Sequence, residues 1–290
     1  MKLIPDRLKF RWSKWQLQRR EQWWAKHEGE NRSIMHPIQD GVAMNLYLDS
    51  ELCKLIYYKH FEAHEREFMN AFLRPGDTFV DVGANIGLFS LIAARVVGPS
   101  GRVFSFEPTP LSYSRLQENI QANGFNNVRT FQLALSDEEG SLEFSKSVDG
   151  FDAWNSPAAP AMGSKIEKEQ VQATTWDKFS VDQDLNGKIT MMKIDVEGWE
   201  SRVLAGARES LKCPDAPLLQ VEFTEEAAIL AGSTCAELYR SLESLGYGMC
   251  VFNADKRCLV PDPIRESYPY QNLFAVKDLA AANSRLRSAG

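Results

Sequence analysis

The sequence predicts an α/β fold with a doubly wound sheet of seven strands, mostly parallel with an antiparallel end, and a helical extension at the N-terminus. From residue 77 onward, apolar segments of strand length alternate with segments of helical periodicity, which is the order of βαβ units. The last two apolar segments, YGMCVFN and NLFAVK, have no helical pattern between them. Because parallel neighbours need a crossover connection, this pair predicts the antiparallel end.

The first 26 residues carry eight Lys and Arg against two Asp and Glu, with Leu8, Trp12 and Trp15 at helical spacing. This pattern predicts a basic, tryptophan-rich amphipathic helix, and we assign residues 1–40 to this extension. Such a helix suits an anionic membrane surface or a partner protein. Alternatively, its tryptophans dock against the chain's own domain and its charges are simply solvated.

Residues from about 27 to 75 are typical of a strand pair followed by a helix, HEREFMNAFL, which ends at an Arg-Pro-Gly stop signal. We assign residues 41–75 to a cap on the main domain, which spans 41–290. In this domain DTFVDVG predicts the first strand, and LFSLIAARVV predicts a helix that a Gly-Pro pair ends. GRVFSFEP predicts the second strand, SYSRLQENIQANG the next helix and VRTFQLAL the third strand.

An irregular segment rich in Pro, Ala and Ser follows, and we expect residues 138–170 to be an insertion that covers the acceptor of a reaction. Within it, SLEF and then VQATTWDKF have only short strand signals. ITMMKIDVEG predicts a buried strand, WESRVLAGARESL a helix, PLLQVEF a strand and AELYRSLESLG a helix. The final strand pair then closes the chain.

Composition restricts the class of protein. The 290 residues are 44% apolar and 25% charged, as in an ordinary globular chain with a sizeable core. The net charge of −6 argues against a nucleic-acid binder. No apolar run approaches the roughly 18 residues of a membrane span, and the N-terminus has no secretory h-region, so we expect a cytoplasmic protein. The five cysteines form no CxxC pair, which argues against disulfides and thiolate zinc.

The turn after the first strand reads DVGANIG, from Asp81 to Gly87. Gly83 and Gly87 allow close backbone approach and positive φ. A dinucleotide fingerprint would read GxGxxG without an acid, and an aspartate beside a pyrophosphate would repel it. Beside a sulfonium or ammonium group, the same aspartate is favourable. The turn therefore predicts a cofactor that carries adenosine and positive charge, and S-adenosylmethionine fits this description.

The next two strands add contacts for such a cofactor. Glu107 ends the second strand, where a carboxylate can accept hydrogen bonds from both ribose hydroxyls. At the end of the third strand, Leu135 offers an apolar contact for adenine, and Ser136 and Asp137 can hydrogen-bond its edge. Alternatively, Ser136 and Asp137 only form a turn or a helix cap.

Three carboxylates follow the later strands. Asp195 and Glu197 lie at and just beyond the end of one strand, and Glu222 ends the next. If these strands are adjacent, the acids gather at one edge and can serve as the base that a hydroxyl nucleophile needs. They could instead hold a hard cation, but they form no recognised metal signature, and we expect no metal. Alternatively, Glu197 caps a helix, and Glu222 pairs with a lysine such as Lys193.

Other candidates lie outside these strand ends. Trp154 and Asn155, next to Phe151 in the irregular segment, are expected to contact the acceptor, and Trp154 could stack on a sugar or a macrocycle. All four histidines precede the glycine turn, and His36 or His64 could fold over the site as a base, although surface positions are commoner.

Read in order, GDTFVDVGANIGLFS, VFSFEP, FQLALSDEEG and MMKIDVEGWESRVLAGA resemble the FkbM-type methyltransferase family over roughly residues 60 to 277. The resemblance implies a class I, Rossmann-like, S-adenosylmethionine-dependent enzyme that methylates hydroxyl oxygens of sugars or polyketide-like natural products. It also places Glu62 near the cofactor entrance. The resemblance implies cofactor roles for Asp81, Gly83, Asn85, Gly87, Glu107, Ser136 and Asp137. With these we expect Ala84, Pro108, Leu135 and Asp195 to bind the cofactor.

Two other functions remain open at this stage. An NAD-linked oxidoreductase is disfavoured by Asp81 and by the missing second glycine. A protein attached to a membrane or a partner through residues 1–26, without turnover, would keep the cofactor fold. As partners we expect a small-molecule or glycan acceptor and no nucleic acid, and a homodimer is left open.

Overall fold

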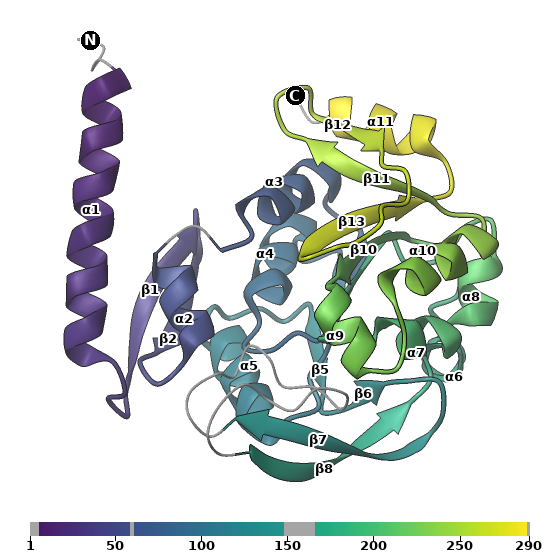
Figure 1. Ribbon diagram of the computed structural model, residues 1–290, viewed down its shortest axis with the longest axis horizontal. Coiled ribbons are helices and arrows are strands. Elements are labelled where there is room, and N and C mark those ends of the chain that lie inside the picture. Colours follow the sequence, from purple (N-terminus) through teal and green to yellow (C-terminus); the bar gives the residue numbers. More distant parts are fainter. Residues whose placement is uncertain (1–5, 59–60, 148–165, 289–290) are drawn as a thin grey trace.

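The computed structural model describes residues 6–58, 61–147 and 166–288 (Figure 1). Its centre is an eight-stranded sheet. In spatial order the strands are β5 (Val128–Phe131), β4 (Arg102–Phe106), β3 (Thr78–Val82), β9 (Met191–Ile194), β10 (Leu218–Phe223), β13 (Gln271–Val276), β11 (Gly248–Asn253) and β12 (Cys258–Pro261). The first five are parallel, and the last three run antiparallel to their neighbours.

The doubly wound, mostly parallel sheet with an antiparallel end is confirmed, with one strand more than the seven predicted. The additional strand is β12, a four-residue edge strand that pairs antiparallel with β11. Its sequence, CLVP, is too short to give a periodic signal and contains proline, which sheets accept at an edge. The sheet therefore gains an edge strand, and the strand order around the glycine turn is unaffected.

Helices cover both faces of the sheet and enclose two hydrophobic layers. Phe79 of β3 packs into one layer, and its neighbour Val80 packs into the other, as the alternation of a strand requires. The first layer is closed by α3 (Ala63–Phe72), α4 (Leu88–Val97), α5 (Pro110–Ala122) and α11 (Leu279–Arg287). The second is closed by α6 (Trp176–Asp182), α7 (Glu200–Ala205), α8 (Arg208–Lys212), α9 (Glu225–Leu230) and α10 (Cys235–Ser244).

A separate three-stranded sheet, in the order β6-β8-β7, replaces much of the irregular structure expected around residues 136–170. The segment VRTFQLAL does not form one strand, because it divides into β5 and β6 (Ala134–Leu135), which belong to different sheets. β7 (Gly140–Ser147) and β8 (Ile166–Thr174) pair antiparallel over eight residue pairs. Because both sequences are charged and only weakly apolar, they lack the regular alternation from which this pairing could be predicted. Phe151, Trp154 and Asn155 lie outside the described residues.

The N-terminal segment begins with α1 (Asp6–His27), which projects beside the body of the molecule in Figure 1. Its last turns dock against the body: Trp24 is fully buried and the Trp23 ring lies 5.4 Å from the Tyr57 ring, whereas Trp15 is 50% exposed. The helix is thus shorter than the predicted extension of residues 1–40, because the residues after His27 lead into a hairpin. This hairpin and the next helix are β1 (Ser33–Gln39), β2 (Val42–Tyr47) and α2 (Glu51–Tyr57).

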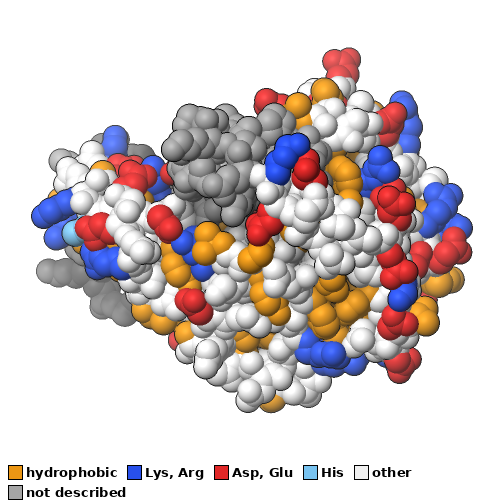
Figure 2. Space-filling view, turned by 90° about the horizontal axis from the view of Figure 1, so that it is seen from below, with side chains coloured by type: hydrophobic (Ala, Val, Ile, Leu, Met, Phe, Trp, Pro, Cys, Tyr) orange, Lys and Arg blue, Asp and Glu red, His pale blue; other side chains and the backbone are white. Residues whose placement is uncertain are grey.

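Docking of Trp23 and Trp24 agrees with the packing alternative for the tryptophans near the end of α1. Membrane contact through residues 1–26, a cytoplasmic location and a homodimer all stay predictions. Among the helices that the structure describes, none combines the length and the apolar character needed to cross a bilayer. Figure 2 shows acidic and basic side chains interspersed with hydrophobic ones over one face of the molecule.

Candidate active site

A cavity of about 970 Å³ lies at the carboxyl ends of the parallel strands. It is lined by the turn after β3, the residues that follow β4, the segment around β6, and the ends of β9 and β10. Its volume falls within the range typical of small-molecule sites, about 300–1,000 Å³. Because the order of the parallel strands reverses at β3, the cavity lies where a doubly wound sheet is expected to bind its ligand.

The turn after β3 is held in a conformation that glycine makes possible. Gly83 has a φ of +80°, and a Cβ atom there would lie 1.8 Å from the backbone oxygen of Asp195. Gly87, with a φ of +97°, immediately precedes α4. Asn85 is also left-handed, with a φ of +47°. The two glycines therefore let the turn pass directly over the end of β9 and enter α4.

The amide groups of this turn are already used within the protein. The N–H groups of Gly83 and Ala84 donate to the Phe106 carbonyl oxygen at 3.1 and 2.9 Å. The N–H of Asn85 donates to Glu107 Oε2 at 3.0 Å. A phosphate-binding turn instead directs such groups at its ligand. The geometry therefore agrees with the expectation from Asp81 that the turn does not hold a pyrophosphate.

Glu107 lies just beyond β4, where the sequence places it, and lines the cavity. Its Oε1 atom accepts hydrogen bonds from the backbone N–H and the hydroxyl of Thr109, at 2.9 and 2.6 Å. Burial raises the pKa of Glu107 to about 7, although these hydrogen bonds and that from Asn85 oppose the rise. Oε2 accepts only one hydrogen bond among the described residues, so it keeps capacity to accept from a ligand hydroxyl.

Asp81 is 1% exposed and lines the same cavity. Its Oδ2 atom accepts a 2.6 Å hydrogen bond from Ser90 of α4, which in turn contacts Ser105. Its Oδ1 atom is buried and, among the described residues, has no hydrogen-bond partner. Burial raises the pKa of Asp81, while the nearby Lys193 ammonium lowers it. The carboxyl group is thus fixed on one side and unsatisfied on the other.

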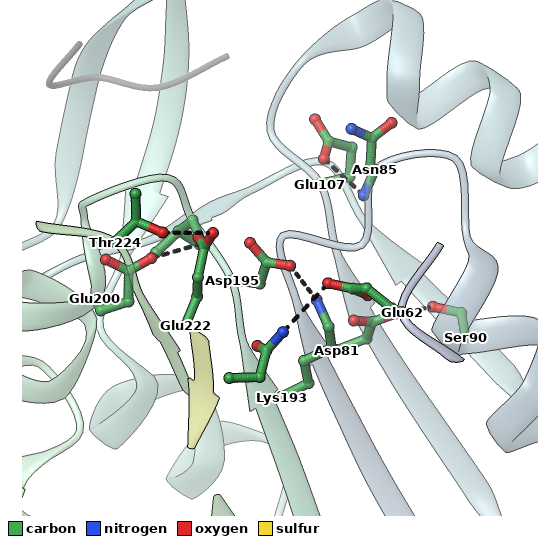
Figure 3. Close-up of polar contacts among 12 residues, drawn as sticks. Glu62, Asp81, Asn85, Ser90, Glu107, Lys193, Asp195, Glu200, Glu222 and Thr224 are labelled. Carbon is green, nitrogen blue, oxygen red and sulfur yellow. Dashed lines mark hydrogen bonds and ion pairs between the residues drawn. The ribbon is translucent and has the colours of Figure 1, made fainter. Parts of the chain in front are cut away.

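Lys193 is 3% exposed, and its Nζ atom lies 2.5 Å from Asp195 Oδ2 (Figure 3). The register of the sheet places Lys193 of β9 beside Asp81 of β3. The same ammonium lies 4.7 Å from the centre of the Phe89 ring. The predicted alternative pairing of Lys193 with Glu222 is wrong, because the lysine reaches the acid two residues along its own strand.

The three carboxylates expected at the edge of the sheet do lie together. One oxygen from each of Asp195, Glu197 and Glu222 lies within 4.8 Å of the other two. Adjacency of β9 and β10 explains this, since Ile194 is paired with Val221 and the next residues follow at the same edge. Burial and the neighbouring Asp195 carboxylate raise the pKa values of Glu197 and Glu222 well above their ordinary range.

Glu200 is the main buried acid that sequence reasoning missed. Its Oε1 atom accepts hydrogen bonds from the N–H groups of Val196 and Gly198, at 3.0 and 3.3 Å. Glu200 therefore satisfies the turn before α7, and Glu197 has a left-handed backbone with a φ of +53°. The motif VEGWE contains both acids, but only the fold shows which one the turn uses.

Ser136 and Asp137 are not among the residues that line the cavity, and their contact with adenine stays a prediction. Ser136 Oγ accepts a 3.1 Å hydrogen bond from the indole N–H of Trp199. Asp137 pairs with Arg202 at 2.6 Å. Burial raises the pKa of Asp137, but the hydrogen bonds from Arg202 and Ser136 outweigh it and lower the pKa. These two residues attach the segment after β6 to α7, whereas Leu135 and Pro108 do line the cavity.

Glu62 lines the cavity from the cap, as the family resemblance implies. It precedes α3 with a left-handed φ of +46°. Its Oε1 atom accepts hydrogen bonds from Tyr270 Oη at 3.0 Å and from Asn272 Nδ2 at 3.4 Å. Burial raises its pKa to about 7. Of the two candidate histidines, His64 lines the cavity and is exposed, whereas His36 is buried near Tyr57 and away from it.

The raised acid pKa values predict an uncommon pH dependence of stability. Burial raises the pKa values of Glu107 and Glu200 to about 7, so between about pH 4.5 and 7 the folded chain binds more protons than the unfolded chain. The free energy of unfolding should therefore fall as pH rises through this window, by a few kcal/mol in all. Urea denaturation of the ligand-free protein at pH 5.5 and 7.5 measures this. Equal or greater stability at pH 7.5 would contradict it.

Comparison with known proteins agrees with the sequence motifs. A family model described as the methyltransferase FkbM domain matches residues 81–249. Methyltransferase sdnD of Sordaria araneosa is 32% identical over 187 residues, which are 54% of this chain and 69% of that protein. The 31-O-demethyl-FK506 methyltransferase FkbM of Streptomyces tacrolimicus is 30% identical over 48% of this chain and 62% of its own length. The 2-O-methyltransferase NoeI of Sinorhizobium fredii is 26% identical over 50% and 63%.

These alignments cover about two thirds of each relative's length. The match to the family model begins at Asp81 and ends in β11, so it contains the glycine turn, Glu107 and all three clustered carboxylates. The cap and α1 lie before it. Most residues that line the cavity therefore lie in the part shared with the family, whereas Glu62, His64 and Tyr270 lie outside it.

Proposed function

The chain belongs to the methyltransferase FkbM domain family, and from this premise we propose that it transfers the methyl group of S-adenosylmethionine to a hydroxyl oxygen of a small molecule or glycan. The observation that carries the proposal is the arrangement of a single cavity. The glycine turn and Glu107 line one part of it, and Asp195, Glu197 and Glu222 line another. Figure 3 shows Glu107 and Asn85 on one side of Asp195, and Glu222 and Thr224 on the other.

The first part of the cavity suits the adenosine of the cofactor. Glu107 would accept hydrogen bonds from the ribose hydroxyls, and Leu135 would pack against adenine. Asp81 would face the positively charged end, where its unsatisfied Oδ1 atom favours a cation. Because the amides of the turn already donate within the protein, a dinucleotide would find few donors for its phosphates.

The second part of the cavity suits the transfer itself. The acceptor oxygen attacks the methyl carbon, the sulfur–carbon bond breaks, and its electron pair stays on sulfur as a neutral thioether. The hydroxyl proton leaves to a carboxylate, and we assign this role to Asp195, which has the Lys193 ammonium beside it. Holding oxygen, carbon and sulfur in line supplies much of the remaining acceleration. Glu197 and Glu222 would surround the acceptor.

We infer the class of acceptor from two relatives. One is named for 31-O-demethyl-FK506, and the other is named a 2-O-methyltransferase. We therefore place the acceptor among hydroxylated natural products and sugars. The test is incubation of the enzyme with a metabolite extract and trideuteromethyl-labelled S-adenosylmethionine, followed by mass spectrometry. The proposal expects a labelled product with the label on oxygen. Label on nitrogen or carbon would overturn the choice of hydroxyl, and cofactor binding without any labelled product would favour a binding protein.

Trp154 supplies a prediction for acceptor recognition, although it lies outside the described residues. If its ring stacks on a sugar or macrocycle, Trp154→Ala should raise KM for the acceptor by roughly 5-fold to 100-fold, since aromatic packing of this kind contributes about 1–3 kcal/mol. The affinity for S-adenosylmethionine should stay the same. Steady-state kinetics and calorimetry on the same preparation measure both quantities, and an equal loss in both would contradict the assignment.

A further inference from the structure

Around Asp195 the cavity wall has more oxygen acceptors than donors. Asp195 Oδ2 contacts the Lys193 ammonium and Glu222 Oε1 accepts from the Thr224 hydroxyl at 3.0 Å. The Oε2 atom of Glu222 is buried and has no hydrogen-bond partner among the residues described. Carboxylates placed this closely repel one another unless a cation or protons compensate them. Within the part of the chain that the structure describes, the Lys193 ammonium is the cation that pairs with this group, and it contacts Asp195.

A second observation comes from the neighbouring strand. Asn272 of β13 is the register partner of Glu222 on β10, so the two side chains leave adjacent strands on the same face of the sheet. Asn272 is 6% exposed, and its Oδ1 atom is also buried without a hydrogen-bond partner within the described ranges. Buried polar atoms normally find a partner. These two buried oxygens on paired residues can therefore accept from a donor or coordinate a cation at this position.

The spacing of the acids fits a single ion. One oxygen from each of Asp195, Glu197 and Glu222 lies within 4.8 Å of the others. Ligands on opposite sides of the ion lie about 4.1 Å apart for Mg²⁺ and about 5 Å apart for Ca²⁺, twice the metal–oxygen distance, so small side-chain movements bring these oxygens onto one ion. We infer that Asp195, Glu197 and Glu222 bind one divalent cation of the Mg²⁺ or Mn²⁺ type, with Asn272 next to the site. This inference replaces the expectation from the sequence that no metal is bound.

Three carboxylates at the wall of an open cavity leave coordination positions for other oxygens. Mg²⁺ usually keeps several such positions for water or substrate. An acceptor hydroxyl bound there would lose its proton more easily, because the cation stabilises the alkoxide, and the proton would leave to solvent water. Asp195 would then act as a ligand instead of a base. This catalytic role rests on the proposed function, whereas binding of the cation does not.

Titration of the protein with Mn²⁺, followed by the electron paramagnetic resonance signal of free Mn²⁺, tests the inference without turnover. We expect one Mn²⁺ bound per chain, displaced by excess Mg²⁺. Glu222→Gln should weaken binding by at least about tenfold, the lower end of what loss of an outer-shell partner costs. Glu222→Asp keeps a carboxylate and should retain part of the affinity. Glu226→Gln is the matched control, since Glu226 is an exposed acid that lines the cavity outside the cluster.

Thermal unfolding and S-adenosylmethionine calorimetry on each variant show whether it is folded. Stoichiometric Mn²⁺ binding that only the Glu222 substitutions weaken supports the inference. No bound Mn²⁺ at millimolar concentration, or binding that Glu226→Gln weakens as much as Glu222→Gln, overturns it. Cofactor binding without Mn²⁺ binding would reject the metal site and leave the proposed function intact. Mn²⁺ binding without cofactor binding would support the metal site and contradict the proposed function.

Discussion

Gly83→Ala is expected to abolish cofactor binding and to lower the stability of the folded chain. A Cβ atom at Gly83 would lie 1.8 Å from the backbone oxygen of Asp195, and the residue has a φ of +80°. Neither the β3 turn nor the end of β9 can shift alone, because the turn is tied to β4 through the Phe106 carbonyl. The left-handed backbone costs about 1–2 kcal/mol for alanine, and the overpacking adds roughly 1–3 kcal/mol.

Gly124→Ala is the matched control for this prediction. Gly124, which follows the end of α5, also has a positive φ, of +65°, but a Cβ atom there would meet nothing within 4 Å. This variant should pay only the conformational cost and bind S-adenosylmethionine like the unchanged protein. Urea denaturation and calorimetry on both variants distinguish the cost of a positive φ for alanine from the cost of the steric clash with the Asp195 backbone. Equal destabilisation, with cofactor binding kept in Gly83→Ala, would show that the turn does not need to pass this closely over β9.

Asp195→Asn is expected to lower kcat by about 10²–10⁴-fold, the usual contribution of a positioned acid or base. Asparagine keeps the size of the side chain but removes the negative charge beside Lys193. The loss is expected whether Asp195 takes the hydroxyl proton or holds a cation. The affinity for S-adenosylmethionine should change much less than kcat, because Glu107 and the glycine turn remain.

Single-turnover kinetics with labelled cofactor measure the transfer step, and calorimetry measures cofactor affinity. The buried Lys193 loses its partner in this variant, so thermal unfolding must be measured alongside. Glu226→Gln again serves as the control for a change of charge at the cavity wall. A kcat within a few-fold of the unchanged enzyme would contradict a chemical role for Asp195 and direct attention to the other carboxylates.

The sequence predicts those residues of the site that lie at the ends of strands. Asp81, Glu107 and the clustered carboxylates each lie at or just beyond the carboxyl end of a recognisable strand, and the carboxyl ends of parallel strands share one edge. Their meeting in one cavity therefore needs only the correct strand order. The cluster forms because β9 and β10 are adjacent, which is the condition that the sequence prediction required.

Other contacts depend on tertiary structure that no local pattern encodes. Glu62 meets Tyr270 and Asn272 only because β13 pairs with β10, which brings together residues about 210 positions apart. Ser136 and Asp137 have suitable chemistry for adenine, and in the structure they contact the indole of Trp199 and the guanidinium of Arg202. Short polar side chains at a strand end suit a ligand and a neighbouring helix equally well, so composition does not decide between the two.

Calorimetric titration with S-adenosylmethionine, on the unchanged protein and on Asp81→Asn, tests most directly whether this cavity is built for a cationic adenosine cofactor. Asparagine can still accept the Ser90 hydrogen bond but carries no charge. The account predicts binding to the unchanged protein and an affinity loss of at least about tenfold, or roughly 1.4 kcal/mol, in the variant. The same affinity in both proteins, or binding of NAD in place of S-adenosylmethionine, would contradict it.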